Sequence, residues 1–441
     1  MNFLSRISTR WSDIFCALVA LVVTALTYHY VLPNPQAGFS LADNTLLTIS
    51  MITYEGLRVL MNQLGFSARV NREYDPAFAV KGAKIGDTLN IRKPPRYVGR
   101  TGNAIRVEAT TETSVPLVLD TLFGVDVEFG SLERTLSLDA YSERVLKPKM
   151  ATIGNKIDLD GLLLYKKVFN AVGTPGTVPS SFSTYIDAGV KLDDEACPQD
   201  DLRYMGISPR MQGTIVNAAI ALFNPQGQIS QSYKKGRMGE FDNFEFFMTQ
   251  NAPTHTVGTY AGAPLVNGAN QTGSSLITDG WSSGASTLKE GDIFTIDNVY
   301  AVNPQNRLST GQLRQFVVTQ DISDTTGAMT ISIYPPIVAS GQFQTVDSVP
   351  ADNAAITVHG TTGRVHRVGL AFHRDFCTLG TADQELPQGV HEAAYIQDPE
   401  SGLSVRTVTA YDVNTNKMVT RTECLYGWAP LYRELACRVS S

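Results

Sequence analysis

Two short patterns contain residue types that carry out catalysis in enzymes. His373, Arg374 and Asp375 follow one another as in the catalytic loop of protein kinases, where the aspartate accepts the proton of the substrate hydroxyl. Gly380 stands where that loop carries a magnesium-binding asparagine, and no glycine-rich phosphate loop precedes the pattern. The pattern G-x-S-x-G around Ser282 places a serine where hydrolases carry their nucleophile, but its flanks are rich in glycine and serine and do not predict the required strand and helix. Neither pattern therefore predicts an active site.

A metal or cofactor site is not indicated either. The acidic residues Asp193, Asp194, Glu195, Asp200 and Asp201 lack the alternating ligands and central glycine of a calcium loop, so we expect a solvated helix end. The histidines show no H-x-x-x-H or H-E-x-x-H spacing, and the cysteines form no C-x-x-C pair, which favours buried thiols in a reducing compartment. These residues are His29, His255, His359, His366, His373 and His391, and Cys16, Cys197, Cys377, Cys424 and Cys437. We expect no catalytic, metal-binding or cofactor-binding residues and a protein that is not an enzyme.

Composition indicates a multidomain protein with much β-structure. A chain of 441 residues is too long for one ordinary core, which favours two or three domains. Charged residues make up only 18% of the chain, and its 36 glycines and 21 prolines indicate many turns. The formal net charge of -6 argues against a protein whose whole surface binds nucleic acid, so any DNA contact must be local.

The clearest charge feature is a basic segment at residues 81–106, which holds seven basic residues and one acid, Asp87. In a self-assembling protein this asymmetry would steer the segment of one subunit onto the acidic body of the next. A solvated charged loop is the alternative, and DNA binding is less favoured because no aromatic stacking pattern accompanies the charge. The candidate subunit-interface residues are Lys81, Lys84, Arg92, Lys93, Arg96, Arg100 and Arg106.

Hydrophobic periodicity predicts three helices. Apolar residues recur at three- and four-residue spacing over residues 46–64, 146–168 and 208–222. Pro148 lies near the start of the second helix, which at about 25 residues would span roughly 40 Å and could brace a whole domain. Ser208 and Pro209 form an N-cap followed by proline at the first helical position of the third helix.

The remaining segments have β character. Between residues 70 and 129, short β runs separated by proline, glycine and charged residues predict a long exposed β-excursion. Residues 255–359 show no helical periodicity, and their many short β runs predict a small barrel inserted into the surrounding fold, with its two ends close together. Further strands are expected at residues 403–411, 417–424 and 427–439.

This order of elements resembles the phage P22-like coat protein family. The stretches that carry the resemblance are NTLLTISMITYEGLRVL, REYDPAFAVKGAKIGDTLNIRKPPRY, TSVPLVLD, FNAVGTPGT, FNPQGQISQSYKKGRMGEFDNFEFFMTQNAPTHT, KEGDIFTIDNVYAVNP and LYGWAPLYRELACRV. They extend over nearly everything from residue 44 onward. The resemblance implies an α+β protein with the HK97 capsid fold and an inserted β-barrel-like domain, acting as the major capsid protein of a tailed bacteriophage.

The resemblance also implies an organisation into parts. These are an N-terminal helical arm at residues 42–68, the E-loop with adjoining P-domain strands at 69–130, the spine helix of the P-domain at 131–175, a P- and A-domain segment at 176–254, the insertion β-domain at 255–359, and the A-domain with a C-terminal β return at 360–441. It implies no catalytic residue and no cofactor.

The implied partners are those of a shell protein. The subunit would assemble with itself into hexamers and pentamers of an icosahedral lattice, together with a scaffolding protein, a portal protein and, in some shells, a decoration protein. Packaged double-stranded DNA would be held by weak non-specific contact. The implied location is the virion capsid, and the host cytoplasm during assembly.

Residues 1–41 depart from the family pattern. A nearly continuous apolar run at residues 15–32 follows Arg6 and Arg10, as in a signal peptide or membrane anchor. We expect Leu41 to be encoded by an alternative initiation codon, so that this hydrophobic extension is not part of the mature coat protein. The alternative function is a membrane-anchored or secreted β-rich surface protein, with Ser282 as a candidate hydrolase nucleophile.

Overall fold

The computed structural model confirms the predicted α+β class, with 21% of residues in helices and 42% in strands. It describes residues 49–72, 86, 88–99, 101–105, 107–129, 142–220, 240–324, 326–398, 402–412 and 417–441. The hydrophobic run at residues 15–32 lies outside these ranges. Within them, no helix is both long and apolar enough to cross a membrane.

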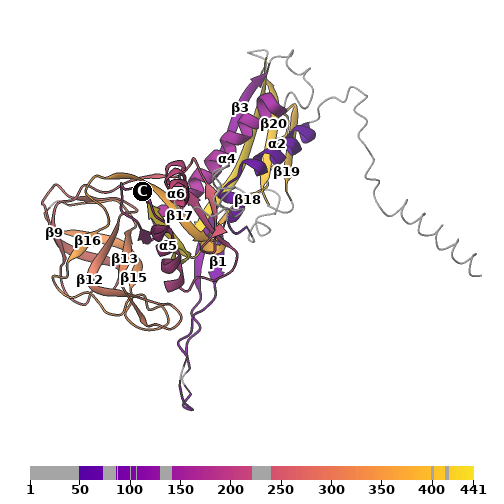
Figure 1. Ribbon diagram of the computed structural model, residues 1–441. Coiled ribbons are helices and arrows are strands. Elements are labelled where there is room, and N and C mark those ends of the chain that lie inside the picture. Colours follow the sequence, from indigo (N-terminus) through magenta and orange to yellow (C-terminus); the bar gives the residue numbers. More distant parts are fainter. Residues whose placement is uncertain are drawn as a thin grey trace, which may run out of the picture. The chain divides into compact units, whose positions relative to one another are not determined.

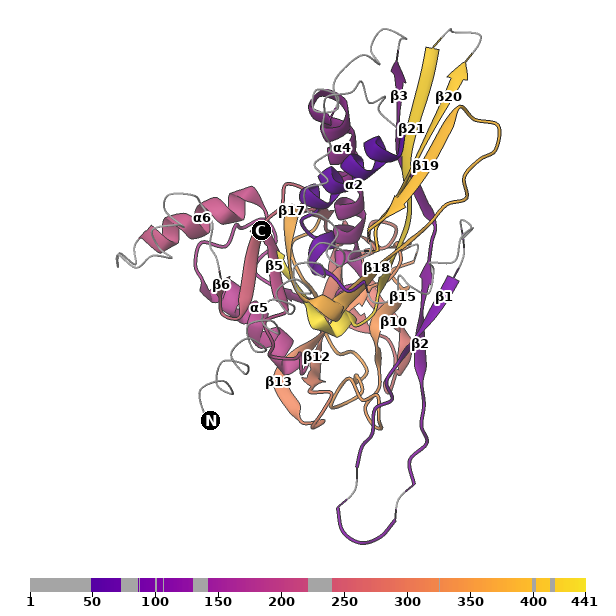
Figure 2. The same cartoon turned by 90° about the vertical axis from the view of Figure 1, so that its right-hand side faces the viewer.

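Two helices form the centre of the first core (Figures 1 and 2). Helix α2 spans Ile49–Gln63. Helix α4 spans Lys147–Leu162, continues a π-helical turn at Ser142–Leu146 and is followed by a 3-10 turn at Leu163–Lys167. Pro148 lies in the first turn of α4, where a missing backbone N–H costs nothing. The first two predicted helices are thereby confirmed.

The apolar faces of α2 and α4 meet because Gly56 leaves room for Met150. A Cβ at position 56 would lie 2.8 Å from the Met150 Cε atom. Buried residues on both helices join one core cluster with strands from the C-terminal part of the chain; they include Leu57, Leu60, Ile153, Ile157, Phe376, Leu379 and Tyr426. Helix α2 also packs against strands β19 and β20 of that sheet.

The sheet behind these helices is antiparallel and has five strands. Its order is β18-β21-β20-β19, with β3 also paired to β21. The bounds are β3 Thr121–Phe129, β18 Cys377–Ala382, β19 Glu392–Gln397, β20 Ser404–Asp412 and β21 Lys417–Pro430. Strand β21 runs without a break through Gly427, so the prediction of separate strands at 417–424 and 427–439 was wrong. The chain turns instead at a 3-10 turn, Arg433–Leu435, before the last strand, β22.

A second, seven-stranded sheet is mixed. Its order is β4-β22-β17-β5-β7-β6, with β8 paired to the start of β17. Helices α5 and α6 accompany this sheet, and the 3.3 Å bond from the Met211 N–H to Ser208 Oγ confirms the predicted N-cap of α6. The bounds are β4 Asn170–Val172, α5 Ser183–Asp194, β5 Arg203–Ile207, α6 Pro209–Ile220, β6 Glu240–Phe241, β7 Phe244–Met248, β8 Thr254–Thr256, β17 Val365–His373 and β22 Ala436–Ser440.

The inserted segment has a core of its own. Its six-stranded sheet has the order β16-β12-β13-β15-β10-β9, and a bridge between Leu265 and Ala355 joins its two edges into a barrel. One hydrophobic cluster made only of residues from Val257 to Val358 fills it. The bounds are β9 Gly262–Val266, β10 Gly273–Trp281, β11 Thr287–Leu288, β12 Ile293–Val302, β13 Ser309–Val318, β14 Ile322–Ser323, β15 Met329–Ile337 and β16 Ile356–Val358. Strands β8 and β17, which lead into and out of the barrel, pair antiparallel, so the ends of the insertion lie side by side.

Candidate subunit interface at the hairpin arm

Part of the basic segment forms a two-stranded arm, residues 88–118. Strand β1 (Thr88–Lys93) pairs antiparallel with β2 (Thr113–Val118), and residues between them continue the arm outward (Figure 2). Pro94 and Pro95 end β1 because proline lacks the N–H that a strand ladder needs. The described arm residues include the predicted interface residues Arg92, Lys93 and Arg96, whereas Lys81, Lys84, Arg100 and Arg106 lie outside the described residues.

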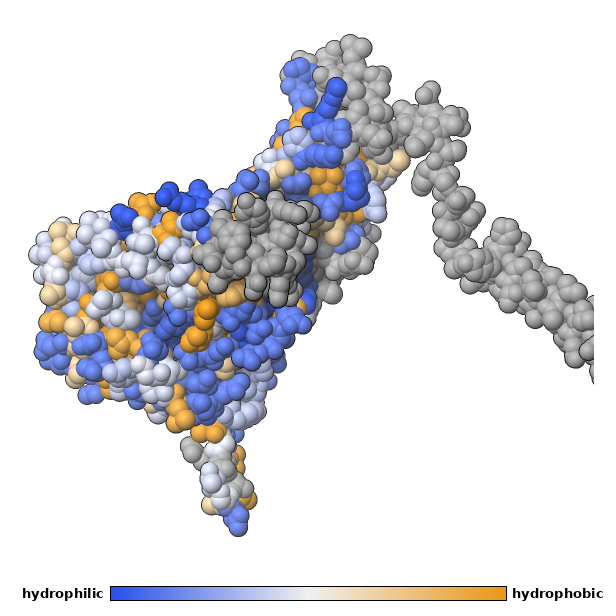
Figure 3. All heavy atoms as spheres, in the orientation of Figure 1, coloured by the Kyte–Doolittle hydropathy of each residue, from blue (hydrophilic) through white to orange (hydrophobic). Residues whose placement is uncertain are grey.

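The outer part of the arm exposes apolar side chains. Ile105 and Val107 are 85% and 89% exposed, and Tyr97 is 54% exposed. Hydrophobic and hydrophilic residues therefore stand side by side on the arm, seen at the bottom of Figure 3. Burying an isoleucine or valine side chain is worth about 1.5–3 kcal/mol. The arm thus carries apolar surface suited to a contact with another molecule.

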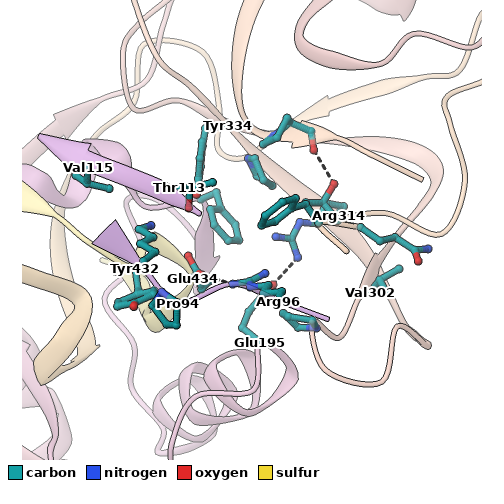
Figure 4. A pocket seen from close by; sticks show the side chains of 18 of the residues that line it. Pro94, Arg96, Thr113, Val115, Glu195, Val302, Arg314, Tyr334, Tyr432 and Glu434 are labelled. Carbon is teal, nitrogen blue, oxygen red and sulfur yellow. Dashed lines mark hydrogen bonds and ion pairs between the residues drawn. The ribbon is translucent and has the colours of Figure 1, made fainter. Parts of the chain in front are cut away.

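The described basic residues of the arm fall into two groups. The Arg92 side chain is 80% exposed and lies 3.5 Å from the carboxylate of Glu112, which directly precedes β2. Lys93 and Arg96 point inward, since the Lys93 ammonium lies 4.9 Å from the Tyr432 ring centroid. An Arg96 nitrogen lies 2.7 Å from a Glu434 oxygen (Figure 4). Burial lowers the pKa of Lys93. These two side chains anchor the arm to its own chain.

The returning half of the arm reduces its charge. Glu108 accepts a 2.7 Å hydrogen bond from the Val98 N–H, and Glu112 faces Arg92. A window that ended at residue 106 missed both acids. Over residues 81–118 the sequence has seven basic and three acidic residues, a net charge of +4. The segment remains positive, against an acidic remainder of the chain.

A cavity of about 440 Å³ lies at the root of the arm (Figure 4). The arm, the inserted barrel and the segment after β21 all contribute to it. Its lining includes Lys93, Pro94, Arg96, Thr113 and Val115 from the arm, Val302, Arg314, Tyr334 and Phe343 from the barrel, and Phe169, Glu195, Tyr432 and Glu434 from the rest of the chain. The cavity therefore marks where the arm leaves the body of the subunit.

A buried ion pair forms one wall of this cavity. Glu195, directly after α5, pairs with Arg314 of β13, and their side chains are 6% and 4% exposed. The Arg314 guanidinium also lies 4.5 Å from the Phe169 ring centroid. Burial raises the pKa of Glu195, and the positive charge of Arg314 opposes that shift. The pair joins the barrel to the body of the subunit.

The prediction that residues 193–201 form a solvated helix end was wrong for Glu195. Neighbouring acids also pair with buried cationic or ionisable groups: Asp193 lies 2.7 Å from the buried Arg203 guanidinium, and Asp200 lies 3.0 Å from His373 Nε2. The partners of these acids lie 10 to 173 residues away in the sequence, so a search for a local pattern of metal ligands could not predict the contacts. Three acids of this run, Asp193, Glu195 and Asp200, therefore make structural contacts.

Around the two patterns that resemble catalytic motifs, at His373 and Ser282, the structure shows contacts and elements that differ from those of an active site. His373 is 1% exposed, and its Nδ1 accepts a 3.2 Å hydrogen bond from the Asp375 N–H while its Nε2 faces Asp200. Strand β10 ends directly before Ser282, so the strand that the flanks did not predict is present, but the chain then continues into β11 and not into a helix. No group of three or more histidine, cysteine, aspartate or glutamate side chains in the described chain is arranged to hold a metal ion. Four of the cysteines, Cys197, Cys377, Cys424 and Cys437, are buried as predicted, and Cys16 lies outside the described residues.

The structure brings together two histidines that their spacing in the sequence did not predict to be close. His255 of β8 and His366 of β17 are directly opposite each other where the chain enters and leaves the barrel. Their ring centroids are 5.5 Å apart. His255 Nδ1 lies 3.1 Å from the Tyr165 hydroxyl, and its Nε2 lies 2.9 Å from Asp292. Only the pairing of β8 with β17 brings the two histidines together.

Comparison with known proteins identifies relatives of the chain. The family model described as "P22 coat protein - gene protein 5" matches residues 57–436. A solved structure from Mycobacterium phage Che8 is 12% identical, with a TM-score of 0.42, and the match covers 85% of this chain and 90% of that one. The capsid structure of the Cyanophage P-SCSP1u is 10% identical, with a TM-score of 0.40, over 84% and 88% of the two chains.

One similarity concerns the inserted segment. The CUS-3 coat protein I-domain is 28% identical, with a TM-score of 0.18, and the match covers 23% of this chain and 96% of that one. Among curated proteins, no sequence is similar enough to the chain to count as a relative.

Proposed function

Because the chain belongs to the P22 coat protein family, we propose that it builds the icosahedral shell of a tailed phage or prophage from hexamers and pentamers of identical subunits. The observation that carries this proposal is the family match over residues 57–436. The protein is a structural major capsid protein with an α+β fold of the HK97 type, and its place is the virion capsid. The alternative of a membrane-anchored or secreted surface protein is not favoured by this match.

We assign the described elements to the parts of such a subunit. Helix α2 belongs to the N-terminal arm (42–68), the hairpin arm to the E-loop segment (69–130), and α4 to the spine helix (131–175). The P- and A-domain segment (176–254) and the C-terminal return (360–441) share the seven-stranded sheet, which supports treating them as one body. The separate core of the barrel supports an insertion domain at 255–359.

The hairpin arm is the proposed contact between neighbouring subunits. Its net positive charge would steer it toward the acidic surface of the next subunit, and its exposed apolar side chains would be buried once it docks. Arg92 is placed for such a contact because its side chain is 80% exposed. Lys93 and Arg96 contribute by holding the root of the arm.

The remaining partners follow from the function. A scaffolding protein would guide assembly in the host cytoplasm, a portal protein would occupy one vertex, and a decoration protein could bind outside. Double-stranded DNA would be enclosed by weak non-specific contact, because a net charge of -6 limits phosphate binding and so favours packaging and release. Shell formation requires no catalytic residue, metal or cofactor, and we propose no enzymatic activity.

Particle formation tests the proposal directly. The full chain and residues 42–441 would be expressed with and without the neighbouring scaffolding protein, then examined by sedimentation and negative-stain microscopy. We expect closed shells of uniform size. A stable monomer from both proteins under both conditions would contradict the shell function.

The electrostatic role of the arm predicts salt-dependent assembly. Changing Arg92, Arg100 and Arg106 to glutamine should slow shell assembly roughly tenfold at low salt, and the difference should shrink above about 0.5 M salt as the charges become screened. Light scattering of purified subunits with scaffolding protein measures the rate. The matched control changes three cations away from the arm, Lys147, Lys417 and Arg421, which are 50–57% exposed. Equal slowing of the two variants would show that net charge, not the arm, sets the rate.

Anchoring of the arm root predicts a different outcome for Arg96. Arg96→Ala removes the ion pair with Glu434 and should increase amide hydrogen exchange at the Lys93–Thr113 end of the hairpin by up to about fivefold, since a partly exposed ion pair contributes at most about 1 kcal/mol. Hydrogen exchange of the unassembled subunit measures this. Arg92→Ala is the control, because the exposed Arg92 side chain does not reach the body. Unchanged exchange in Arg96→Ala would remove the anchoring role.

A further inference from the structure

The entrance to the inserted barrel is a buried cluster of ionisable side chains. His255 and His366 face each other across the β8–β17 pair, and Asp292, just before β12, holds His255 Nε2 at 2.9 Å. The second oxygen of Asp292 accepts hydrogen bonds from the Gly258 and Lys289 N–H groups. We refer to this region, residues 253–258 with 359–367 and the side chains that face it, as the gateway.

A permanent cation lies in the same cluster. Arg438 of β22 is 3% exposed and donates hydrogen bonds to two carbonyl groups, Gly291 O at 2.6 Å and Val168 O at 2.6 and 3.0 Å. Burial lowers the pKa of Arg438 to about 10, so the guanidinium still carries its charge at neutral and acidic pH. Its hydrogen bonds tie β22 of the body to the segment that begins β12 of the barrel.

Two histidines of the gateway each have a buried ring nitrogen that would find no hydrogen-bond acceptor if it were protonated. His366 Nδ1 and His359 Nε2 are buried and have no hydrogen-bond partner. Burial, together with the charge of Arg438, lowers the pKa of both rings to about 4. His255 and His359 also disfavour a charge on His366, and Asp292 is the one carboxylate that opposes the shift of His366.

The charged and titratable groups around the two rings come from three elements. Arg438 of β22 acts on both His366 and His359, and His255 of β8 and Asp292 before β12 act on His366. Beside them, the Tyr165 hydroxyl lies 3.1 Å from His255, and Glu290 pairs with Lys167 and with Lys166. With the histidines neutral, the cluster has one buried cation and one buried carboxylate. Each further proton would add an uncompensated positive charge.

We propose that the gateway is an acid-sensitive joint: protonation of His366 and His359 opens the contact between the inserted barrel and the body of the subunit while both keep their own cores. Opening admits water to the two ring nitrogens and separates them from Arg438, so the open state binds the protons that the closed state excludes. The barrel can stay folded because its main hydrophobic cluster, from Val257 to Val358, has no member from the body. Only the small cluster of Phe169 and Ala171 with Ile293 and Val317, among the described residues, is shared between barrel and body and would separate on opening.

The expected size of the effect follows from the two pKa values. A histidine that shifts from about 4 in the closed joint to 6.5 in the open joint favours opening roughly 20-fold more at pH 5 than at pH 7. Two such histidines together would change the opening equilibrium by a few hundredfold. Protonation of the histidines and opening of the joint do not require assembly. The joint is therefore testable in the unassembled subunit and independently of the proposed shell function.

Hydrogen exchange at single-segment resolution, at pH 7 and pH 5 with exchange times scaled for the slower intrinsic exchange in acid, tests the joint in the full chain. We expect lost protection at the gateway amides Val257 and Gly363, which bond across the β8–β17 pair to Arg364 and Gly258. The β12–β13 ladder and the β17–β22 ladder should stay protected at pH 5. Gateway protection that does not change with pH, or simultaneous loss over the whole chain, would overturn the proposal.

Variants assign the effect to the histidines. His359→Gln with His366→Gln should abolish most of the pH dependence at the gateway, and each single variant should remove about half of it on a logarithmic scale. His391→Gln is the matched control, because the His391 side chain is 50% exposed and far from the cluster in sequence. If the double variant fails to fold, the two single variants decide. Full pH dependence in both single variants would overturn the assignment.

Discussion

Arg314→Met should lower the free energy of unfolding by about 3–5 kcal/mol at pH 7. The substitution leaves the Glu195 carboxylate, whose side chain is 6% exposed, without its cation, and a buried charge that has lost its partner is strongly destabilising. Methionine keeps much of the aliphatic volume beside Phe169, so the change reports mainly the lost charge. Urea unfolding of the unassembled subunit measures it.

Acid should restore part of this loss. Burial raises the pKa of Glu195 above its unfolded value, and removing Arg314 raises it further because the opposing positive charge is gone. A carboxyl with a raised pKa binds more protons in the folded state than in the unfolded state, so stability increases as pH falls through the folded pKa and is recovered near the unfolded value. We therefore expect a smaller difference from wild type at pH 5 than at pH 7.

The double variant Glu195→Gln with Arg314→Met isolates the charge effect. It should be more stable than Arg314→Met alone at pH 7, because no buried carboxylate remains. Arg92→Met is the matched control, since the Arg92 side chain is 80% exposed, and it should change stability by less than about 0.5 kcal/mol. A loss in Arg314→Met that is small and independent of pH would show that the pair contributes little to the junction between barrel and body.

Asp158→Ala should be similarly destabilising, by about 3–4 kcal/mol. The Asp158 carboxylate, 5% exposed on α4, accepts hydrogen bonds from the N–H groups of Gly65, Phe66 and Ser67 at 2.7, 3.2 and 2.9 Å, and from the Ser67 hydroxyl. Alanine would leave these donors buried without an acceptor, and each such group costs about 1–3 kcal/mol before relaxation. The chain would lose the hydrogen bonds that hold the turn after α2 against α4, which we call the clasp.

Two further variants separate this effect from a general effect of charge. Asp158→Asn retains one acceptor oxygen and should lose roughly half as much stability as alanine. Asp187→Ala removes an exposed carboxylate on α5 and should leave the urea midpoint almost unchanged. Equal midpoints for Asp158→Ala and Asp187→Ala would contradict the clasp. Because α2 belongs to the proposed N-terminal arm, we also expect Asp158→Ala to reduce the yield of closed shells.

Much of the architecture was predictable because it depends on patterns within short stretches of the sequence. Apolar spacing of three and four residues placed α2 and the long helix that contains α4, and the dense turns of residues 255–359 indicated a separate β-domain. The resemblance to the coat family agreed with these elements and is confirmed by the family match. Boundaries were less predictable: β21 continues through Gly427 because its pairing with β18 outweighs the break that a glycine suggests.

The direction of side chains was decided only by tertiary structure. By sequence, Lys93 and Arg96 belong to one uniform basic segment with Arg92, yet they turn inward because Tyr432 and Glu434 lie beside the root of the arm. Strand alternation places Lys93 and Arg92 on opposite faces of β1, but it does not say which face turns inward, since the partners of Lys93 and Arg96 lie more than 330 residues away in the chain. The basic segment was therefore predictable as a charged arm, but not the separation of its exposed and anchoring residues.

The same reason explains the two buried polar clusters. The sequence by itself determined the family, the α+β class and the order of the parts, because these follow from periodicity, composition and motif order within short windows. Glu195 forms an ion pair with Arg314, which lies 119 residues further along the chain. His255 lies beside His366 only because β8 pairs with β17. A side chain's charge and burial depend on which distant elements pack around it, so the ion pair and the gateway emerge only once the chain is folded.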